Sequence, residues 1–369
     1  MPKLFEPVRV GPNKLDTRIA LAPLTRLRSD DDWVPLPVVK EYYEQRASVP
    51  GTMLITEATA ISKGTVGVKN VPGIWSEAQI LAWKDIVDAV HKKGSFIYLQ
   101  LWHMGRAGQP SVHQELGTKL KSSSAVPIDD ASATPEEMTE DEIKQTIQEF
   151  ADAAKNAVKA GFDGVEIHGA NGYLIDQFTQ DNCNRRTDSW GGSIENRARF
   201  AIEVTKAVVE AIGADKTGIR LSPFSTFQSM LMKDPYPQFK YLVRQLKALN
   251  LAYLHLVEPR IAGSTEGDTD PDPRFKLGFF VKIWDNQSPI VVAGGFTAES
   301  AAKAVEETYK GYDIIVAFGR YFISNPDLVF RLKTAVDLAK YDRSTFYIRK
   351  SPKGYVDYPF SSKFLAKAA

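Results

Sequence analysis

His168, Asn171 and Tyr173 lie within six positions of one another, with two glycines between them. Histidine and asparagine can both donate hydrogen bonds to a single oxygen atom, and so can stabilise negative charge that develops there. A tyrosine hydroxyl beside them can supply a proton. The spacing fits a buried histidine at a strand end and a surface tyrosine equally well, so it leaves both interpretations open.

A second group of residues could bind an anion. Gly294-Gly295 and Gly319-Arg320 each follow a short apolar run in the last third of the chain. Glycine lets backbone N–H groups approach an anion closely, and arginine can donate two parallel hydrogen bonds to phosphate oxygens. Tight turns without a ligand are the alternative. The position of Arg320 favours phosphate binding.

The residues around these groups alternate between short β-branched runs and longer amphipathic segments, which is typical of a parallel α/β fold. Eight apolar runs are predicted strands: Ile19–Ala22, Met53–Glu57, Phe96–Leu101, Gly164–Ile167, Gly218–Leu221, Tyr253–Val257, Ile290–Ala293 and Ile314–Ala317. Helices are predicted between most of them, over Ala78–Lys92, Thr139–Ala160, Ile194–Ile212, Gln238–Leu249, Ala298–Thr308 and Pro326–Leu338.

Eight strands with intervening helices predict one (β/α)8 barrel that comprises residues 1–369 as a single domain. An open doubly wound sheet is the alternative, but it usually carries G-x-G-x-x-G after its first strand, and this sequence has none. Residues 8–11 are expected to begin an N-terminal hairpin that closes the bottom of the barrel. The segments Gly105–Met138 and Glu258–Arg274 are predicted to be long loops over its mouth, and the second of them to be mobile.

Polar residues and glycines follow almost every predicted strand on its C-terminal side. In a β/α barrel these strand ends meet at one mouth, where such residues indicate a binding site. They include Pro23, Thr25, Gln100, Trp102, His168, Asn171, Tyr173, Arg220, Gly294, Gly295, Gly319 and Arg320. The anion site and the His168 segment are therefore expected to belong to the same site.

Other kinds of chemistry have little support in the sequence. No metal site is expected, because the chain has five histidines, none paired at i and i+4, and one cysteine. A serine hydrolase is disfavoured because G-x-S-x-G does not occur. Buried, paired carboxylates are expected at Glu57 and Glu166. Structural roles are expected for His91, His113 and His255.

The composition is that of an ordinary globular protein, with 43% hydrophobic and 25% charged residues. A formal net charge of +1 gives no reason to expect a nucleic-acid or membrane-surface partner. Signal-peptide and membrane-span patterns are missing from the sequence, so we expect a cytoplasmic protein, either a monomer or a homodimer, with small-molecule partners.

Several longer segments of the sequence closely resemble the Old Yellow Enzyme family, in its yeast and fungal branch. The resemblance extends in order from about residue 4 to residue 360. The segments are 22–26 (APLTR), 45–47 (QRA), 50–52 (PGT), 56–58 (TEA), 72–76 (PGIWS), 100–102 (QLW), 163–168 (DGVEIH), 190–197 (WGGSIENR), 220–223 (RLSP), 318–327 (FGRYFISNPD) and 354–359 (GYVDYP).

This resemblance implies a tightly bound FMN at the barrel mouth and NADPH as the hydride donor. Thr25 would hydrogen-bond the flavin O4 edge, Gln100 the pyrimidine side, and Arg220 would place positive charge near N1 and O2. The other implied cofactor contacts are Pro23, Ala58 and His168 at the ring, Gly294, Gly295, Gly319 and Arg320 at the phosphate, and Phe346, which with Tyr347 resembles the family's aromatic pair near the flavin and the nicotinamide.

For the substrate, the resemblance implies that His168 and Asn171 bind the oxygen of an α,β-unsaturated carbonyl or nitro compound. Tyr173 would protonate the α carbon after hydride adds at the β carbon. The pocket would be lined by Trp102, Phe227 and Tyr347. An ene-reductase is thus the expected activity.

The sequence also resembles fungal members that act in ergot alkaloid synthesis, some of which reduce an unsaturated aldehyde while others isomerise it. A flavin-dependent isomerase or reductase of such an aldehyde is therefore the alternative activity. The presence of Tyr173 favours reduction. The two long loops, which are expected to overhang the mouth, depart most from the yeast pattern.

Overall fold

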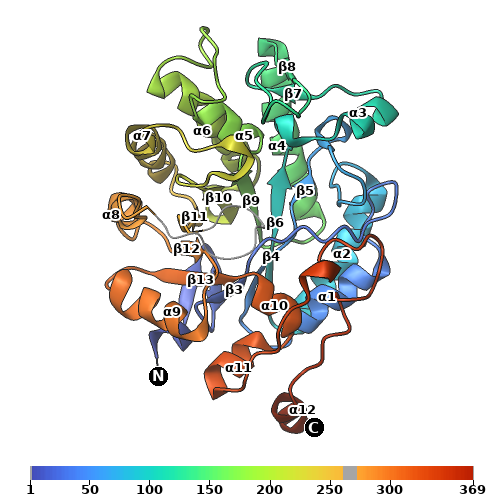
Figure 1. Cartoon of the computed structure of the whole chain (residues 1–369). Helices are drawn as coiled ribbons and strands as arrows, with labels where there is room; N and C mark the ends of the chain where they lie inside the picture. The colour runs from blue at the N-terminus through green and yellow to red at the C-terminus, as the bar shows by residue number, and fades with distance from the viewer. Residues whose placement is uncertain (1, 261–271, 369) are drawn as a thin grey trace.

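The computed structural model describes residues 2–260 and 272–368, and its centre is a closed barrel of eight parallel strands (Figure 1). Each of the eight lies at a run that the sequence predicts as a strand, so the predicted (β/α)8 barrel is confirmed. The strands are β3 (Ile19–Leu21), β4 (Met53–Ile55), β6 (Phe96–Trp102), β9 (Gly164–Gly169), β10 (Thr217–Leu221), β11 (Tyr253–Val257), β12 (Ile290–Ala293) and β13 (Ile314–Phe318).

Pairing between the first and last strands closes the barrel. Phe318 of β13 lies opposite Leu21 of β3, and β4 pairs with β6. The two-residue strand β5 (Thr59–Ala60) adds to the outer end of β6. The C-terminal ends of all eight strands therefore meet at one mouth, as the sequence predicts.

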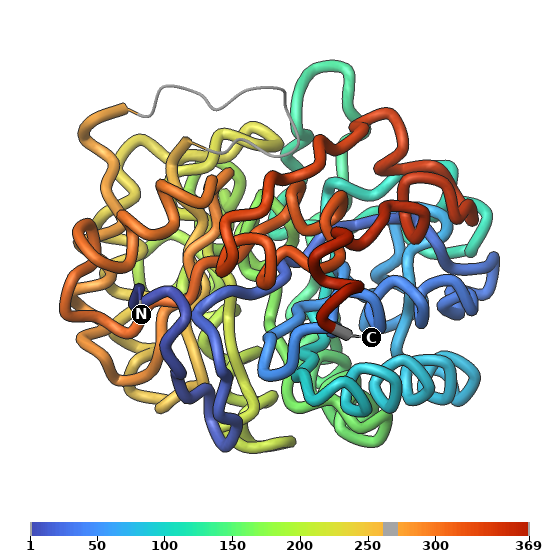
Figure 2. Tube along the Cα trace, turned by 90° about the horizontal axis from the view of Figure 1, so that it is seen from below, coloured from blue at the N-terminus to red at the C-terminus, as the bar shows by residue number. Residues whose placement is uncertain are grey.

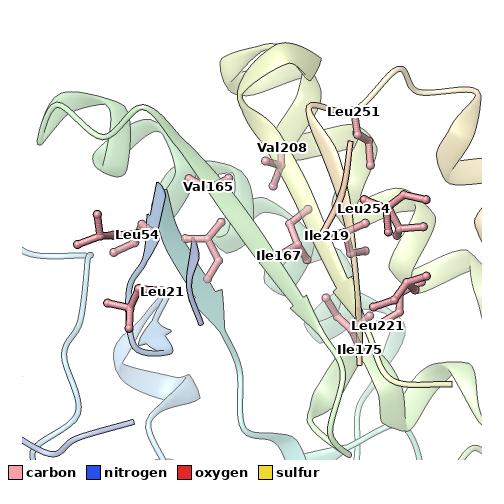
Figure 3. Packing of buried hydrophobic residues seen from close by; sticks show 14 of the residues in the cluster. Leu21, Leu54, Val165, Ile167, Ile175, Val208, Ile219, Leu221, Leu251 and Leu254 are labelled. Atoms are coloured by element: carbon pink, nitrogen blue, oxygen red, sulfur yellow. The ribbon is translucent and has the colours of Figure 1, made fainter. Parts of the chain in front are cut away.

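Residues of each strand alternate between two cores, because successive side chains of a strand point to opposite sides. On β3, Leu21 packs outward against the helices, whereas Ala20 and Ala22 point into the barrel. On β9, Val165 and Ile167 point outward, which leaves Glu166 and His168 to point inward. Figure 3 shows part of the outer core, with residues of β9, β10 and β11 packed beside Val208 of α6.

Helices cover the outside of the barrel. They are α1 (Pro37–Arg46), α2 (Glu77–Lys92), α4 (Glu140–Lys159), α5 (Leu174–Thr179), α6 (Ile194–Ile212), α7 (Pro235–Lys247), α8 (Gly278–Trp284), α9 (Ala298–Lys303), α10 (Arg320–Ser324), α11 (Leu328–Thr334) and α12 (Ser362–Ala368). Among the described residues, no helix has the length and apolar character that crossing a membrane requires.

The predicted helices agree with the structure at α2, α4, α6 and α7, and differ elsewhere. The sequence does not predict the short helices α1, α5, α8, α10 and α12, because 5 to 10 residues give too little periodicity to detect. The helix expected over Pro326–Leu338 covers only Leu328–Thr334. The helix expected over Ala298–Thr308 becomes a π-helix from Ala304 onward.

The hairpin at the N-terminus is confirmed, since β1 (Val8–Val10) pairs antiparallel with β2 (Asn13–Leu15). Gly105–Met138, expected to be a loop, is partly folded into α3 (Pro110–Leu116) and the short parallel pair β7 (Lys121–Ser122) and β8 (Glu136–Glu137). Most of the predicted mobile loop Glu258–Arg274 lies outside the described residues.

The segment after α11 folds back across the N-terminal half of the barrel (Figure 2). Two buried arginines that follow β3 hold it by its backbone. Arg26 donates from Nε to the Phe346 carbonyl at 3.1 Å and from Nη2 to the Gly354 carbonyl at 2.7 Å. Arg28 donates to the Phe346 carbonyl at 2.8 Å and the Lys353 carbonyl at 3.0 Å. These bonds fix Phe346 at the mouth of the barrel.

Candidate functional site

The barrel mouth holds a cavity of about 420 Å³ at the C-terminal ends of the strands. Most of the site residues that the sequence predicts line it: Pro23, Thr25, Trp102, Asn171, Tyr173, Arg220, Phe227, Gly294, Gly295, Gly319, Arg320, Phe346 and Tyr347. Ala58, Gln100 and His168 are buried and are not among the lining residues, but the His168 ring contacts that of Tyr173, which lines the cavity. The structure thus gathers residues from six strand ends around one cavity.

The turn after β9 places three predicted residues together at the cavity wall. The Tyr173 ring meets the edge of Trp102 at a centroid distance of 5.0 Å and that of His168 at 4.9 Å. Asn171 has a positive φ of 58°, and its backbone N–H donates to Ser222 Oγ at 2.7 Å. Gly172 follows with φ of 71°, a region in which glycine is favoured. Asn171 and Tyr173 consequently face the same cavity.

The protonation states of His168 and Tyr173 follow from their surroundings. Burial, together with the positive charge of Arg220, lowers the pKa of His168 well below its usual value, so the imidazole is neutral. Burial, together with Tyr347, raises the pKa of Tyr173 to about 12, so this hydroxyl keeps its proton at neutral pH. The site therefore holds a neutral hydrogen-bonding imidazole beside a protonated phenol.

A buried polar network lies directly beneath the cavity. Gln100 Nε2 donates to Glu166 Oε1 at 2.7 Å, and the Glu166 Oε2 atom lies 2.8 Å from His255 Nδ1. Burial alone would raise the pKa of Glu166, but His255, Arg220 and Gln100 together lower it. The expectation of a buried, paired carboxylate at Glu166 is confirmed. The negative charge of Glu166 partly offsets the positive charge of the neighbouring Arg220.

Three buried polar atoms of residues that line the cavity have no hydrogen-bond partner among the described residues: Arg26 Nη1, Trp102 Nε1 and Arg220 Nε. Buried donors of this kind are rare unless a ligand or water accepts from them. The guanidinium of Arg220 is mostly buried and lines the cavity. An electron-rich, planar group with acceptor atoms on its edge fits this donor set.

The predicted anion site lies at the other side of the cavity. Gly294 and Gly295 follow β12, and Gly319 and Arg320 follow β13. Gly295 has φ of 63°, and a Cβ on Gly294 would lie 2.4 Å from Glu258 Cβ. Glycine is therefore required at both positions. Backbone N–H groups here can approach a phosphate more closely than larger residues would allow.

Some lining residues escaped the sequence analysis. Arg343, near the aromatic pair Phe346 and Tyr347, could have been found from that proximity. Met104, Ala107 and Gln109 come from the start of the long segment after β6, whose sequence gives no indication of which residues turn inward. The others are Ala22, Leu24, Arg26, Leu27, Val68, Val257, Ala293, Phe296, Ala317, Phe318, Tyr321 and Ile323, mostly apolar or next to predicted site residues.

Comparison with known proteins agrees with this geometry. The model of the NADH:flavin oxidoreductase / NADH oxidase family matches residues 3–339. Chanoclavine-I aldehyde reductase fgaOx3 of Penicillium roqueforti is 58% identical over 99% of this chain and 98% of its own length. NADP-dependent oxidoreductase lnbE of Aspergillus flavus is 54% identical over 98% of this chain and 97% of its own.

Among solved structures, the crystal structure of Old Yellow Enzyme from Pichia sp. AKU4542 is similar over the whole barrel. Its TM-score is 0.91 at 38% identity, and the match covers 98% of this chain and 94% of that one. The resemblance that the sequence motifs indicate is thereby confirmed.

Proposed function

The chain belongs to the NADH:flavin oxidoreductase / NADH oxidase family, and from that premise we propose that it is an FMN-dependent ene-reductase that oxidises NADPH. Its substrate in this proposal is an alkene conjugated to a carbonyl or nitro group. The observation that carries the proposal is the turn after β9, which presents Asn171 and the proton-bearing Tyr173 to the cavity, with the His168 ring 4.9 Å from that of Tyr173.

The residues that line the cavity support FMN as the bound cofactor. Gly294, Gly295, Gly319 and Arg320 would hold the phosphate, and the unpartnered Nε of Arg220 would donate to the pyrimidine edge. Thr25, Pro23 and Phe346 line the space between these two ends. When bound there, FMN supplies hydride transfer from NADPH to the β carbon of the alkene.

The side chains of the turn would do the remaining chemistry. His168 and Asn171 would donate hydrogen bonds to the substrate oxygen, which stabilises the negative charge that develops on it as hydride arrives. Because the His168 imidazole is neutral, it would donate a hydrogen bond without transferring its proton to the substrate. Tyr173 would then transfer the proton of its hydroxyl to the α carbon, completing the saturation of the double bond.

An anaerobic visible spectrum of the purified protein tests this function. We expect a bound flavin whose absorbance bleaches on addition of NADPH and returns on addition of 2-cyclohexenone. A protein that neither contains nor retains FMN would contradict the cofactor assignment. Flavin that bleaches with NADPH but does not recover with the enone would contradict general ene-reductase activity.

The alternative substrate class is an unsaturated aldehyde of alkaloid biosynthesis, favoured by the similarity to a chanoclavine-I aldehyde reductase. Such an aldehyde contains the same conjugated carbonyl, so His168 and Asn171 would have the same role. An isomerase would return the hydride with no net consumption of NADPH. Counting NADPH oxidised per aldehyde converted separates the two outcomes: one equivalent indicates reduction, and none indicates isomerisation.

We predict that His168→Ala weakens the binding of a phenol such as 4-hydroxybenzaldehyde by about 10- to 100-fold, the usual effect of losing a hydrogen bond to an ionised oxygen. Because the pKa of His168 is far below its usual value, affinity should show no inflection from this residue between pH 5 and 8. Titration monitored by visible absorbance measures both. His91→Ala, on the outer helix α2, is the control; equal weakening in both variants would contradict the assignment.

A second prediction concerns the phosphate end. Gly294→Ala should weaken FMN binding by about tenfold or more, because its methyl group must displace Glu258, and overpacking of this kind typically costs 1–3 kcal/mol. Fluorescence titration of the apoprotein with FMN measures the effect. Gly278→Ala, where an added Cβ has no atom within 4 Å, is the matched control. Normal affinity in the Gly294 variant would place the phosphate elsewhere.

A further inference from the structure

A chain of buried hydrogen bonds connects the turn after β9 to the loop after β10. The backbone N–H of Gly172 donates to Asp176 Oδ2 at 2.9 Å. The other carboxylate oxygen, Oδ1, accepts from Gln180 Nε2 at 2.8 Å. Gln180 Oε1 in turn accepts from the backbone N–H groups of Leu231, at 3.0 Å, and Met232, at 2.9 Å. Both side chains, Asp176 and Gln180, are fully buried.

The loop at the far end of this chain of bonds is strained and packs directly on the turn. Gln228, Ser229 and Leu231 have φ values of 57°, 56° and 77°, in a region of backbone conformation that residues other than glycine rarely adopt. Such conformations persist only where the surroundings hold them. A Cβ on Gly172 would lie 2.9 Å from Gln228 Cβ. The loop also carries Phe227, which lines the cavity.

The hydrogen-bond chain requires an ionised carboxylate at position 176. The amide of Gln180 cannot turn over, because its oxygen already accepts from two backbone N–H groups. Its NH₂ group must therefore face Asp176, as must the Gly172 N–H. The two donors approach different oxygens, and only a carboxylate offers two oxygens that carry no hydrogen. An asparagine would place its NH₂ group against one of the donors, and protonation of the aspartate weakens its acceptance at one oxygen.

We propose that Asp176 and Gln180 are positioning residues for the alkene step, holding Asn171 and Tyr173 against the loop that carries Phe227. The proposal rests on the function proposed above, since it assigns the turn its role in that reaction. Asp176 does not line the cavity, so its effect reaches the substrate only through the backbone of Gly172.

The surroundings of Asp176 give this arrangement a pH dependence. Burial raises the pKa of Asp176 to about 6, while the bonds from Gln180 and Gly172 and the charge of Arg106 oppose the shift. The other titratable group that faces it is the buried thiol of Cys183, whose own pKa is raised by burial, so it stays neutral. The carboxylate is the form above pH 6, and its acceptor is lost as the pH falls through that value.

The test is the rate at which an enone reoxidises the reduced holoenzyme, measured by stopped flow from pH 5 to 8. In the wild type we expect this rate to fall below about pH 6 along one ionisation. Asp176→Asn should lower it about 10- to 100-fold at pH 7.5, the usual result of a misplaced catalytic group, and remove the inflection. Flavin reduction by NADPH and the affinity for FMN should be unchanged. Gln180→Ala should also lower the rate of reoxidation by the enone.

Asp163→Asn is the matched control. Asp163 precedes the other end of β9, where it accepts from the Ile97 N–H at 2.7 Å, far from the cavity. Three results would overturn the positioning role: a wild-type rate without an inflection near pH 6, an Asp176→Asn variant with the wild-type rate and profile, or equal losses in both half-reactions. If Asp176→Asn does not fold, the wild-type profile and Gln180→Ala still decide. A wild-type enzyme that no enone reoxidises would instead contradict the proposed function, and the positioning role with it.

Discussion

Tyr173→Phe is expected to slow reduction of an enone by about 10²–10⁴-fold, the usual contribution of a general acid, while the reduction of bound flavin by NADPH proceeds at its normal rate. The change removes the hydroxyl and leaves the ring, which packs against Trp102 and His168. Stopped-flow measurement of the two half-reactions separates the effects. Because the pKa of Tyr173 is about 12, the wild-type rate should not fall through loss of this proton below about pH 11.

Tyr98→Phe is the control for the loss of a buried hydroxyl. Tyr98 points into the bottom of the barrel, where its hydroxyl accepts from Asn13 Nδ2 at 2.9 Å. This variant should keep both half-reactions. Unchanged enone reduction in Tyr173→Phe would show that another donor, such as water, protonates the α carbon.

Glu166→Gln should have the largest effect on stability, because it leaves the charge of Arg220 without its buried counter-charge. Removing one of two opposite buried charges costs about 3 kcal/mol in free energy of unfolding, measured by urea denaturation. The folded state lowers the pKa of Glu166 from 4.5, so its stabilising effect is present above pH 4.5 and is lost as the pH falls through the lowered value. The difference in free energy of unfolding between Glu166→Gln and the wild type should therefore shrink as the pH falls through the lowered pKa of Glu166.

The same substitution should raise the midpoint potential of the bound flavin by about 20–40 mV, because the uncompensated positive charge of Arg220 favours the more negative, reduced cofactor. Asp327→Asn is the control. It breaks a buried ion pair between Asp327, which precedes α11, and Arg331 of α11, whose Oδ1 and Nε atoms lie 2.7 Å apart. It should lower stability and leave the potential unchanged. A potential that does not move in Glu166→Gln would separate Arg220 from the flavin.

The strands and the mouth of this barrel could be predicted because each strand is a short, buried run whose end carries a polar residue or glycine. Arg220 and His168 are examples. Successive side chains of a strand point to opposite sides, so the position of each residue in its strand decides that it points into the barrel. The network beneath the cavity could not be predicted. Glu166 and His255 are 89 residues apart, and only the register of β9, β10 and β11 brings them to 2.8 Å.

The helices and loops show a similar division. Amphipathic helices of three or more turns, such as α4 and α6, give a clear periodic pattern, whereas α5 has 6 residues, all buried. Asp176 lies on α5, and nothing in its sequence context distinguishes it from a surface carboxylate. Its importance comes from the fixed orientation of Gln180, which depends on backbone groups 51 and 52 residues away. Such constraints are set by tertiary contacts and have no local signal.

The arginine bonds to the segment after α11 have a consequence for the order of events during synthesis. The barrel closes only when β13 pairs with β3, and Phe346 reaches the mouth only when Arg26 and Arg28 bind its carbonyl. The binding site is therefore complete only after two residues 320 positions apart in the chain, Arg26 and Phe346, have come together. Capture of FMN is therefore expected to follow synthesis of residue 346, and shorter chains are expected to lack the complete site.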